Sequence, residues 1–143
     1  LRQCKGFELF KVPICCAVSI NHPLATKDKL SIKDLYGENL MLMHRGWSKY
    51  VDILRDDLWT NHHNINIVDF DFYSVDVFNQ CQNSNDILMA IDAWSSVHPL
   101  LKIIPVEWEH TIPYGLLHST NPSDNVNKLL NAIKLVLEDK NEL

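Results

Sequence analysis

The chain has 143 residues, a length that suits one domain or one lobe of a two-lobed domain. With 46% apolar and 22% charged residues, it falls among globular proteins and not among disordered ones. Its formal net charge of −5 argues against direct nucleic-acid binding, for which a clustered basic face is expected. No apolar run approaches the roughly 20 residues that span a bilayer, and no secretory signal is visible.

The four cysteines lack the spacing of a metal site or a redox pair. Cys15 and Cys16 are neighbours on a predicted strand, so their side chains point to opposite faces and suit packing better than joint ligation. No C-x-x-C pair occurs in the chain. We therefore expect reduced thiols, a cytoplasmic protein and no contact with a membrane.

The first predicted element is a long or bent strand over residues 7–20. Its residues are mostly apolar and β-prone, and Pro13 interrupts them near the middle, which places the strand at an edge or a bulge. A short helix is then expected between Ser31 and Gly37. Ser31 is followed three residues later by Asp34, as in a capping box, and glycine commonly follows the end of a helix.

The middle of the chain alternates between predicted strands and helices. A strand is expected over residues 39–44, because the unbroken apolar run over residues 40–43 suits a strand covered on both faces, as in a parallel sheet. Residues 47–58 carry apolar side chains at i, i+3, i+4, i+7 and i+11, which is typical of an amphipathic helix. A second buried strand (residues 64–72), a helix (74–82) and a strand (87–91) follow. This order predicts an open α/β sheet.

The last third of the chain extends the same alternation. A short helix is expected over residues 94–97, with strands over residues 101–106 and 111–119. A C-terminal helix is expected over residues 121–140, because its first two residues, Asn and Pro, suit the N-cap and the first helical position. The helix carries a stripe of six apolar residues: Val126, Leu129, Leu130, Ile133, Val136 and Leu137.

Three consecutive features near the end of the first strand form a specific pattern. The strand runs directly into Asn-His-Pro-Leu-Ala at residues 21–25, and a lysine-rich turn follows at residues 27–29. Ile-Lys-Asp-Leu-Tyr-Gly then occupies residues 32–37. Together these features resemble the effector-binding domain of LysR-type transcriptional regulators, and the order of the later elements is similar to that family as well.

The resemblance implies an α/β fold of the periplasmic-binding-protein-like type II, in which crossing strands join two lobes. Residues 22–108 would form the second lobe, with a mostly parallel sheet. Residues 1–21 and 109–143 would supply the crossing strands and the C-terminal helix of the first lobe, which is otherwise truncated. The chain would then be a partial effector-binding domain.

The resemblance also implies a binding module that is not an enzyme and holds no cofactor. A small anionic metabolite would favour one arrangement of the lobes and so change DNA binding through a helix-turn-helix that this chain lacks. A homodimer formed through the effector domains is implied too. The alternative is a solute-binding protein of a transport system, which shares the two-lobed architecture but would follow a signal peptide or a lipid anchor.

The turn after the first fully buried strand is a candidate effector site. It contains Arg45, Gly46, Trp47 and Ser48, between that strand and the strongly predicted helix. Ligands of open α/β sheets bind outside the carboxyl ends of the strands, and the start of a helix favours an anion. Arg45 adds a bidentate carboxylate donor and Trp47 a flat apolar wall. The alternative is a solvated arginine beside a core tryptophan.

Tyr73 and Ser74 occupy the corresponding position after the next strand and open the next helix. In LysR-type domains this turn contributes effector contacts, so the resemblance assigns both residues to the effector site. The alternative is that Ser74 only caps its helix. Asp76 in the first turn would suit the helix dipole and would discourage an anion.

Metal and catalytic sites are not expected. The seven histidines share no ligand spacing, and His62 and His63 are neighbours that cannot easily both bind one metal. Ser48 and Ser74 approximate the position of a hydrolase nucleophile, but neither has the flanking glycines of a G-x-S-x-G turn. The sequence therefore predicts no catalytic residue, no metal and no cofactor.

Overall fold

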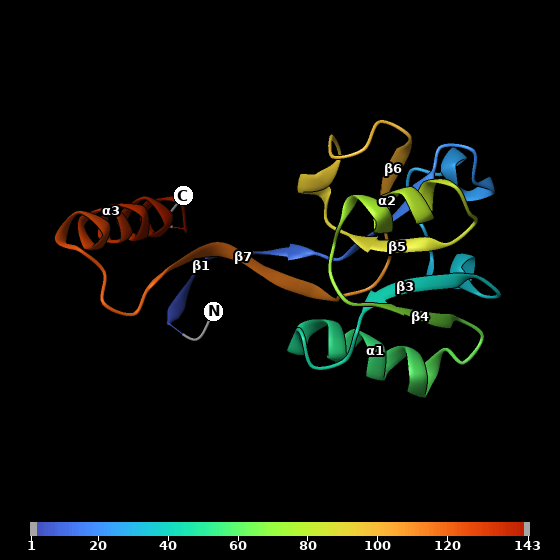
Figure 1. Cartoon of the computed structure of the whole chain (residues 1–143), viewed down its shortest axis with the longest axis horizontal. Helices are drawn as coiled ribbons and strands as arrows, with labels where there is room; N and C mark the ends of the chain where they lie inside the picture. The colour runs from blue at the N-terminus through green and yellow to red at the C-terminus, as the bar shows by residue number, and fades with distance from the viewer. Residues whose placement is uncertain (1–2, 142–143) are drawn as a thin grey trace. The chain divides into compact units, whose positions relative to one another are not determined.

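The computed structural model describes residues 3–141 and divides them into two compact units (Figure 1). The larger unit is Val12–Ile112, and the smaller unit joins residues 3–11 to residues 113–141. The ends of the expected domain, residues 1–2 and 142–143, lie outside the described residues. All candidate effector residues belong to the larger unit.

A five-stranded sheet in the order β4-β3-β5-β2-β6 forms the centre of the larger unit. The strands are β2 (Cys15–Ser19), β3 (Asn39–Met43), β4 (Asn66–Phe70), β5 (Ile87–Ala90) and β6 (Leu101–Pro105). β3 is parallel to β4 and β5, whereas β2 is antiparallel to β5 and β6. β6 therefore runs in the same direction as β3, β4 and β5. The mostly parallel α/β sheet expected from the sequence is confirmed, with β2 as its antiparallel strand.

The larger unit is longer than the expected lobe of residues 22–108 because β2 is a central strand of its sheet. Cys15 lies opposite Ala90 of β5 and Pro105 of β6, and every residue of β2 is buried. The strand expected over residues 7–20 is therefore two strands, β1 (Cys4–Pro13) and β2. They are separate because β1 pairs with β7 (Thr111–Ser119), whereas β2 pairs within the five-stranded sheet.

Two helices cover the opposite faces of this sheet. α1 (Lys49–Asn61) packs the apolar stripe expected for it against one face, and α2 (Val75–Gln82) packs against the other. Side chains alternate between faces along each strand, so Cys16 lies in the layer of α1 and its neighbour Ala17 in the layer of α2. This arrangement opens the starts of both helices at the carboxyl ends of the parallel strands.

The short helices are 3-10 turns at Pro23–Thr26, Ile32–Leu35 and Asp92–Trp94. The second has the capping box expected from the sequence, because the Asp34 carboxylate accepts the Ser31 N–H at 2.8 Å. Gly37 follows with a φ of 81°, a left-handed conformation that glycine adopts without strain. The third turn begins earlier than the helix expected over residues 94–97, directly after β5.

His22, at the centre of the His-Pro-Leu-Ala pattern, is a buried structural residue. The residue is 3% exposed. Its Nδ1 accepts the Leu24 N–H at 3.0 Å and so caps the first 3-10 turn. Because Nδ1 is an acceptor, Nε2 carries the hydrogen and donates to the Asn85 carbonyl at 3.1 Å. The ring thus ties the end of β2 to the segment before β5.

The smaller unit contains an antiparallel ribbon and a helix. The N–H of Thr120 donates to the Gln3 carbonyl at 3.1 Å, which places the end of β7 beside the start of β1. Gly115 is required in this ribbon, because a Cβ atom there would lie 2.1 Å from the Phe7 carbonyl oxygen. No residue in ranges 3–11 and 113–140 is fully buried, so this unit has no core of its own.

The C-terminal helix α3 (Asp124–Asn141) begins later than expected. Ser123 caps it, since its Oγ accepts the Val126 N–H at 3.3 Å. Asn121 and Pro122 are therefore not the N-cap and first helical residue. Serine is as good an N-cap as asparagine, and starting at Asp124 places a carboxylate in the first turn, where it favours the helix dipole.

Candidate functional site

The carboxyl ends of β3 and β4 lead into two turns that lie side by side. The His44 N–H after β3 donates to the Phe70 carbonyl of β4 at 2.8 Å. Further along the same turns, the rings of Trp47 and Phe72 meet edge to face, with their centroids 4.6 Å apart. We call the surface formed by residues 44–48 and 71–75 the carboxyl rim. It brings together both groups of residues that the sequence singled out.

Arg45 and Gly46 already have partners on the rim. Arg45 forms an ion pair with Asp56 of α1 at 2.5 Å, and both side chains are more than half exposed. Its hydrogen bond to Asp56 raises the pKa of Arg45, so the guanidinium stays charged. Gly46 has a φ of 95°, and its N–H donates to the Asp52 carboxylate at 3.1 Å. A carboxylate of the protein thus occupies the position where an anion was expected.

Both serines of the expected site cap their helices. Ser48 Oγ accepts the Val51 N–H and Ser74 Oγ accepts the Val77 N–H, each at 3.4 Å. The alternative interpretation of Ser74 as a helix cap therefore describes its contacts in this structure. Each cap fixes the direction in which the chain leaves its turn and enters its helix.

Tyr73 points into the protein. Its hydroxyl donates to the Met89 carbonyl at 2.7 Å, and its ring packs edge to face on Phe70 and Trp94. Burial raises the pKa of the Tyr73 hydroxyl, which remains a neutral hydrogen-bond donor. Tyr73 therefore supports the rim from behind, while its neighbour Phe72 is 60% exposed.

The sequence analysis missed Arg55, which holds the rim in place. This residue is 8% exposed, and its guanidinium donates to the Met43 carbonyl at 2.6 Å and pairs with Asp69 at 2.7 Å. α1 is thereby fastened to the last residues of β3 and β4. Position 55 lies four residues after Val51 on the buried stripe of α1, so the helical period contained the signal.

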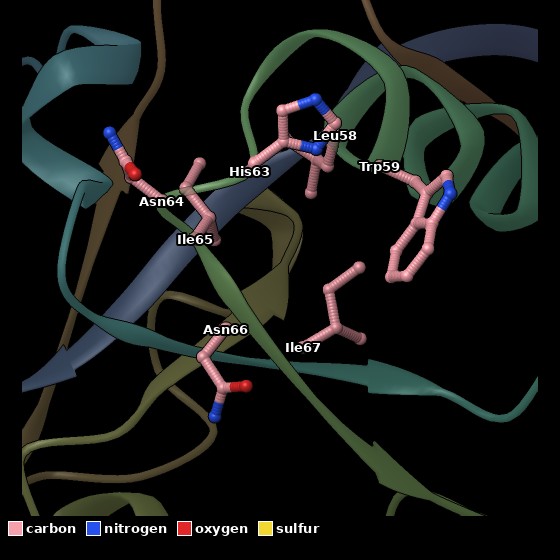
Figure 2. Close-up of a pocket in the computed structure, with 7 residues that line it drawn as sticks. All are labelled: Leu58, Trp59, His63, Asn64, Ile65, Asn66 and Ile67. Atoms are coloured by element: carbon pink, nitrogen blue, oxygen red, sulfur yellow. The ribbon is translucent and has the colours of Figure 1, made fainter.

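A hollow lies at the opposite end of β4, away from the rim. It has a volume of about 420 Å³ and is lined by Leu58, Trp59, His63, Asn64, Ile65, Asn66 and Ile67. Figure 2 shows Trp59 of α1 and Ile67 of β4 facing the same space, with His63 beside it. Trp59 is 75% exposed, and β4 is an edge strand, so this flank of the unit is open.

Two other kinds of site are absent from residues 3–141. No three His, Cys, Asp or Glu side chains of that range gather in a way that could hold a metal ion. No helix of that range is long and apolar enough to cross a membrane. The cysteines are free thiols, and Cys4 is the exposed one among them.

Comparison with known proteins identifies the fold of the chain. No protein-family model and no curated protein matches the sequence. Among solved structures, the effector-binding domain of QuiR in complex with shikimate matches with a TM-score of 0.67 at 18% identity, over 97% of this chain and 67% of that one. The chain has the fold of a LysR-type effector-binding domain.

Two further structures support this assignment of the fold. The BenM effector-binding domain with its effector benzoate matches with a TM-score of 0.66 at 16% identity, over 97% of this chain and 65% of that one. CbnR, a LysR family transcriptional regulator, matches with a TM-score of 0.71 at 9% identity, over 94% of this chain and 48% of that one. The chain thus spans about two thirds of the isolated domains and about half of CbnR.

Proposed function

We propose that this chain is the effector-sensing part of a LysR-type transcription regulator. A small anionic molecule binds at the carboxyl rim and changes DNA binding by a helix-turn-helix elsewhere in a longer protein. The observation that carries the proposal is the match of 97% of the chain to the effector-binding domains of QuiR with shikimate and BenM with benzoate. The proposal includes a cytoplasmic location and the absence of catalysis.

The proposed mechanism is a population shift between arrangements of two lobes. In this proposal the second lobe is the larger unit, which contains the expected residues 22–108 together with β2, and the crossing strands and C-terminal helix of the first lobe belong to the smaller unit. An effector that binds one arrangement more tightly than the other shifts the equilibrium by its difference in binding free energy. The chain enters and leaves the larger unit at the same end as the rim, where Cys15 lies opposite Ala90 and Pro105.

Arg45 is the proposed anchor for an effector carboxylate. Both side chains of its ion pair with Asp56 are exposed, and exposed ion pairs are screened by water and contribute little. An effector carboxylate can therefore replace Asp56 at little cost and gain a bidentate contact. The first turn of α1 begins beside Arg45, and its positive dipole end favours the same charge.

Removing Arg45 tests this function. Arg45→Ala is expected to weaken benzoate binding about tenfold, because hydrogen bonds to charged groups contribute about 1.5–3 kcal/mol. Lys49→Ala removes an equal charge from the start of α1 and serves as the matched control. The measurement is isothermal titration calorimetry on the full chain with benzoate, and with benzamide as the uncharged analogue. Equal affinities of the Arg45→Ala variant and the parent for benzoate would assign Arg45 to the solvated surface.

The proposal also includes a homodimer. In the smaller unit, the apolar stripe of α3 is incompletely covered: Leu129 and Val136 are exposed and the other four residues are partly buried. Apolar surface of this kind favours association. We expect light scattering to give the mass of a dimer, and Leu129→Glu with Val136→Glu to give a monomer. Lys134→Glu changes charge on the same helix and is the control. A monomeric parent chain would contradict the proposal.

A further inference from the structure

Two aromatic side chains on the carboxyl rim face water. Trp47 is 53% exposed and Phe72 is 60% exposed, although their rings already touch edge to face at 4.6 Å. They come from different turns, so the pair exists only because β3 and β4 are neighbours. Val75, the first residue of α2, is also exposed and continues the apolar surface. Large apolar groups gathered in the open mark a binding surface more often than single ones do.

Four polar groups of the rim are already engaged within the protein. Ser48 and Ser74 cap their helices, and the Tyr73 hydroxyl is bonded to the Met89 carbonyl. The Gly46 N–H donates to Asp52. A ligand recognised through these groups would have to displace an existing partner from each of them. Contact with the aromatic pair displaces only water, so the apolar surface is the readiest contact that the rim offers.

Charge on the rim limits the ligand further. Arg45 is the cation of the turn after β3 and is two residues from Trp47. The turn after β4 and the first turn of α2 carry Asp71 and Asp76, both exposed. One arginine suits one carboxylate, whereas a second negative charge would approach the aspartates and be repelled. The rim therefore disfavours molecules with several negative charges.

We propose that the effector is a planar aromatic monocarboxylate, whose ring packs on Trp47 and Phe72 while its carboxylate pairs with Arg45. This inference rests on the proposed function above and narrows its effector from any small anion to one chemical class. Trp47 and Phe72 are its specificity-determining residues. Tyr73 is a positioning residue that acts through Phe70 and Trp94 to hold the turn after β4.

The first test compares ligands on the unaltered full chain by calorimetry. Benzoate and shikimate both carry one carboxylate on a six-membered ring, but only the benzoate ring is flat, aromatic and free of hydroxyl groups. Phthalate keeps the aromatic ring and adds a second carboxylate. Benzoate is expected to bind at least about tenfold more tightly than shikimate or phthalate, because only benzoate combines aromatic packing with a single charge.

The second test uses variants of the aromatic pair. Trp47→Ala and Phe72→Ala are each expected to weaken benzoate binding about tenfold and to leave the weak shikimate binding unchanged. Trp47→Phe should retain most of the benzoate affinity. Trp59→Ala is the matched control, because Trp59 is more exposed than Trp47 but lies beside the hollow at the other end of β4. Thermal unfolding of each variant shows whether it remains folded.

Each outcome decides between the two proposals. If shikimate binds as tightly as benzoate, or if Trp47→Ala behaves like Trp59→Ala, the aromatic part of the class is wrong. If phthalate binds as tightly as benzoate, the restriction to one carboxylate is wrong. In each case effector sensing stands. If no carboxylate binds at millimolar concentrations, the carboxyl rim is not an effector site and both proposals are overturned. Preferential binding of benzoate that depends on Trp47 and Phe72 supports both.

Discussion

Replacing His22 by alanine is expected to lower the free energy of unfolding by about 3 kcal/mol. The change leaves the Leu24 N–H without its cap and the Asn85 carbonyl without its donor. Because His22 is 3% exposed, water cannot replace the ring without reorganising the surrounding chain. The lost ring also leaves a cavity between the end of β2 and the segment that leads to β5.

Urea unfolding measures this loss, and two variants control for it. His22→Asn keeps an N-cap acceptor for Leu24 but does not reach Asn85, so a loss of about 1–2 kcal/mol is expected. His63→Ala removes an exposed histidine and should change stability by less than about 0.5 kcal/mol. If His22→Ala and His63→Ala unfold at the same urea concentration, the structural role assigned to His22 is wrong.

This role explains why the His-Pro-Leu-Ala pattern indicated the fold correctly. The pattern is specific because four requirements meet at residues 22–25: a buried cap, a proline at the start of the turn, and two apolar residues, Leu24 and Ala25, that pack against the core. A segment that closes a fold in this way identifies the fold. It says nothing about a ligand, since every polar atom of the His22 ring is used internally.

Periodicity predicted most elements of the larger unit, because burial acts on each strand and helix locally. The strand expected over residues 39–44 is β3, and the helix expected over residues 47–58 is α1. The division of the strand expected over residues 7–20 was missed, because β1 and β2 look like one strand in the sequence. Their division depends on which partner each strand pairs with, and the partners of β2 lie 71–90 positions further along the chain, a separation that leaves no local trace in the sequence.

The sequence predicted that the two turns of the candidate site lie side by side, but it did not predict their contacts. Strand order alone brings the turns after β3 and β4 together, and that order follows from the alternation of strands and helices. The contacts within the turns were not predictable, because they join residues such as Tyr73 and Met89 that share no pattern. A tyrosine that follows a strand can point outward or inward. The direction depends on whether the fold places a carbonyl within hydrogen-bonding distance of its hydroxyl.

The second large effect on stability is expected from replacing Arg55, which holds α1 against the ends of β3 and β4. Arg55→Ala is expected to lower the free energy of unfolding by about 2–3 kcal/mol. The loss falls below the usual range for a broken buried pair because Asp69 is about half exposed and can be hydrated. The Met43 carbonyl, by contrast, loses the 2.6 Å hydrogen bond at the end of β3. α1 is then attached to the sheet by apolar contacts alone.

Arg55→Met separates the loss of packing from the loss of the polar contacts. Methionine fills most of the space of the arginine stem without placing a charge among buried groups, so the loss should fall to about 1 kcal/mol. Arg45→Met is the matched control, because that arginine is exposed and its ion pair adds little to stability. Chemical denaturation compares the three variants.

Nuclear magnetic resonance of the Trp47 indole N–H reports on the carboxyl rim. We expect Arg55→Met to shift that signal, since the ends of β3 and β4 set the spacing of the Trp47–Phe72 pair. An unmoved signal together with unchanged stability would mean that apolar packing alone positions the carboxyl rim.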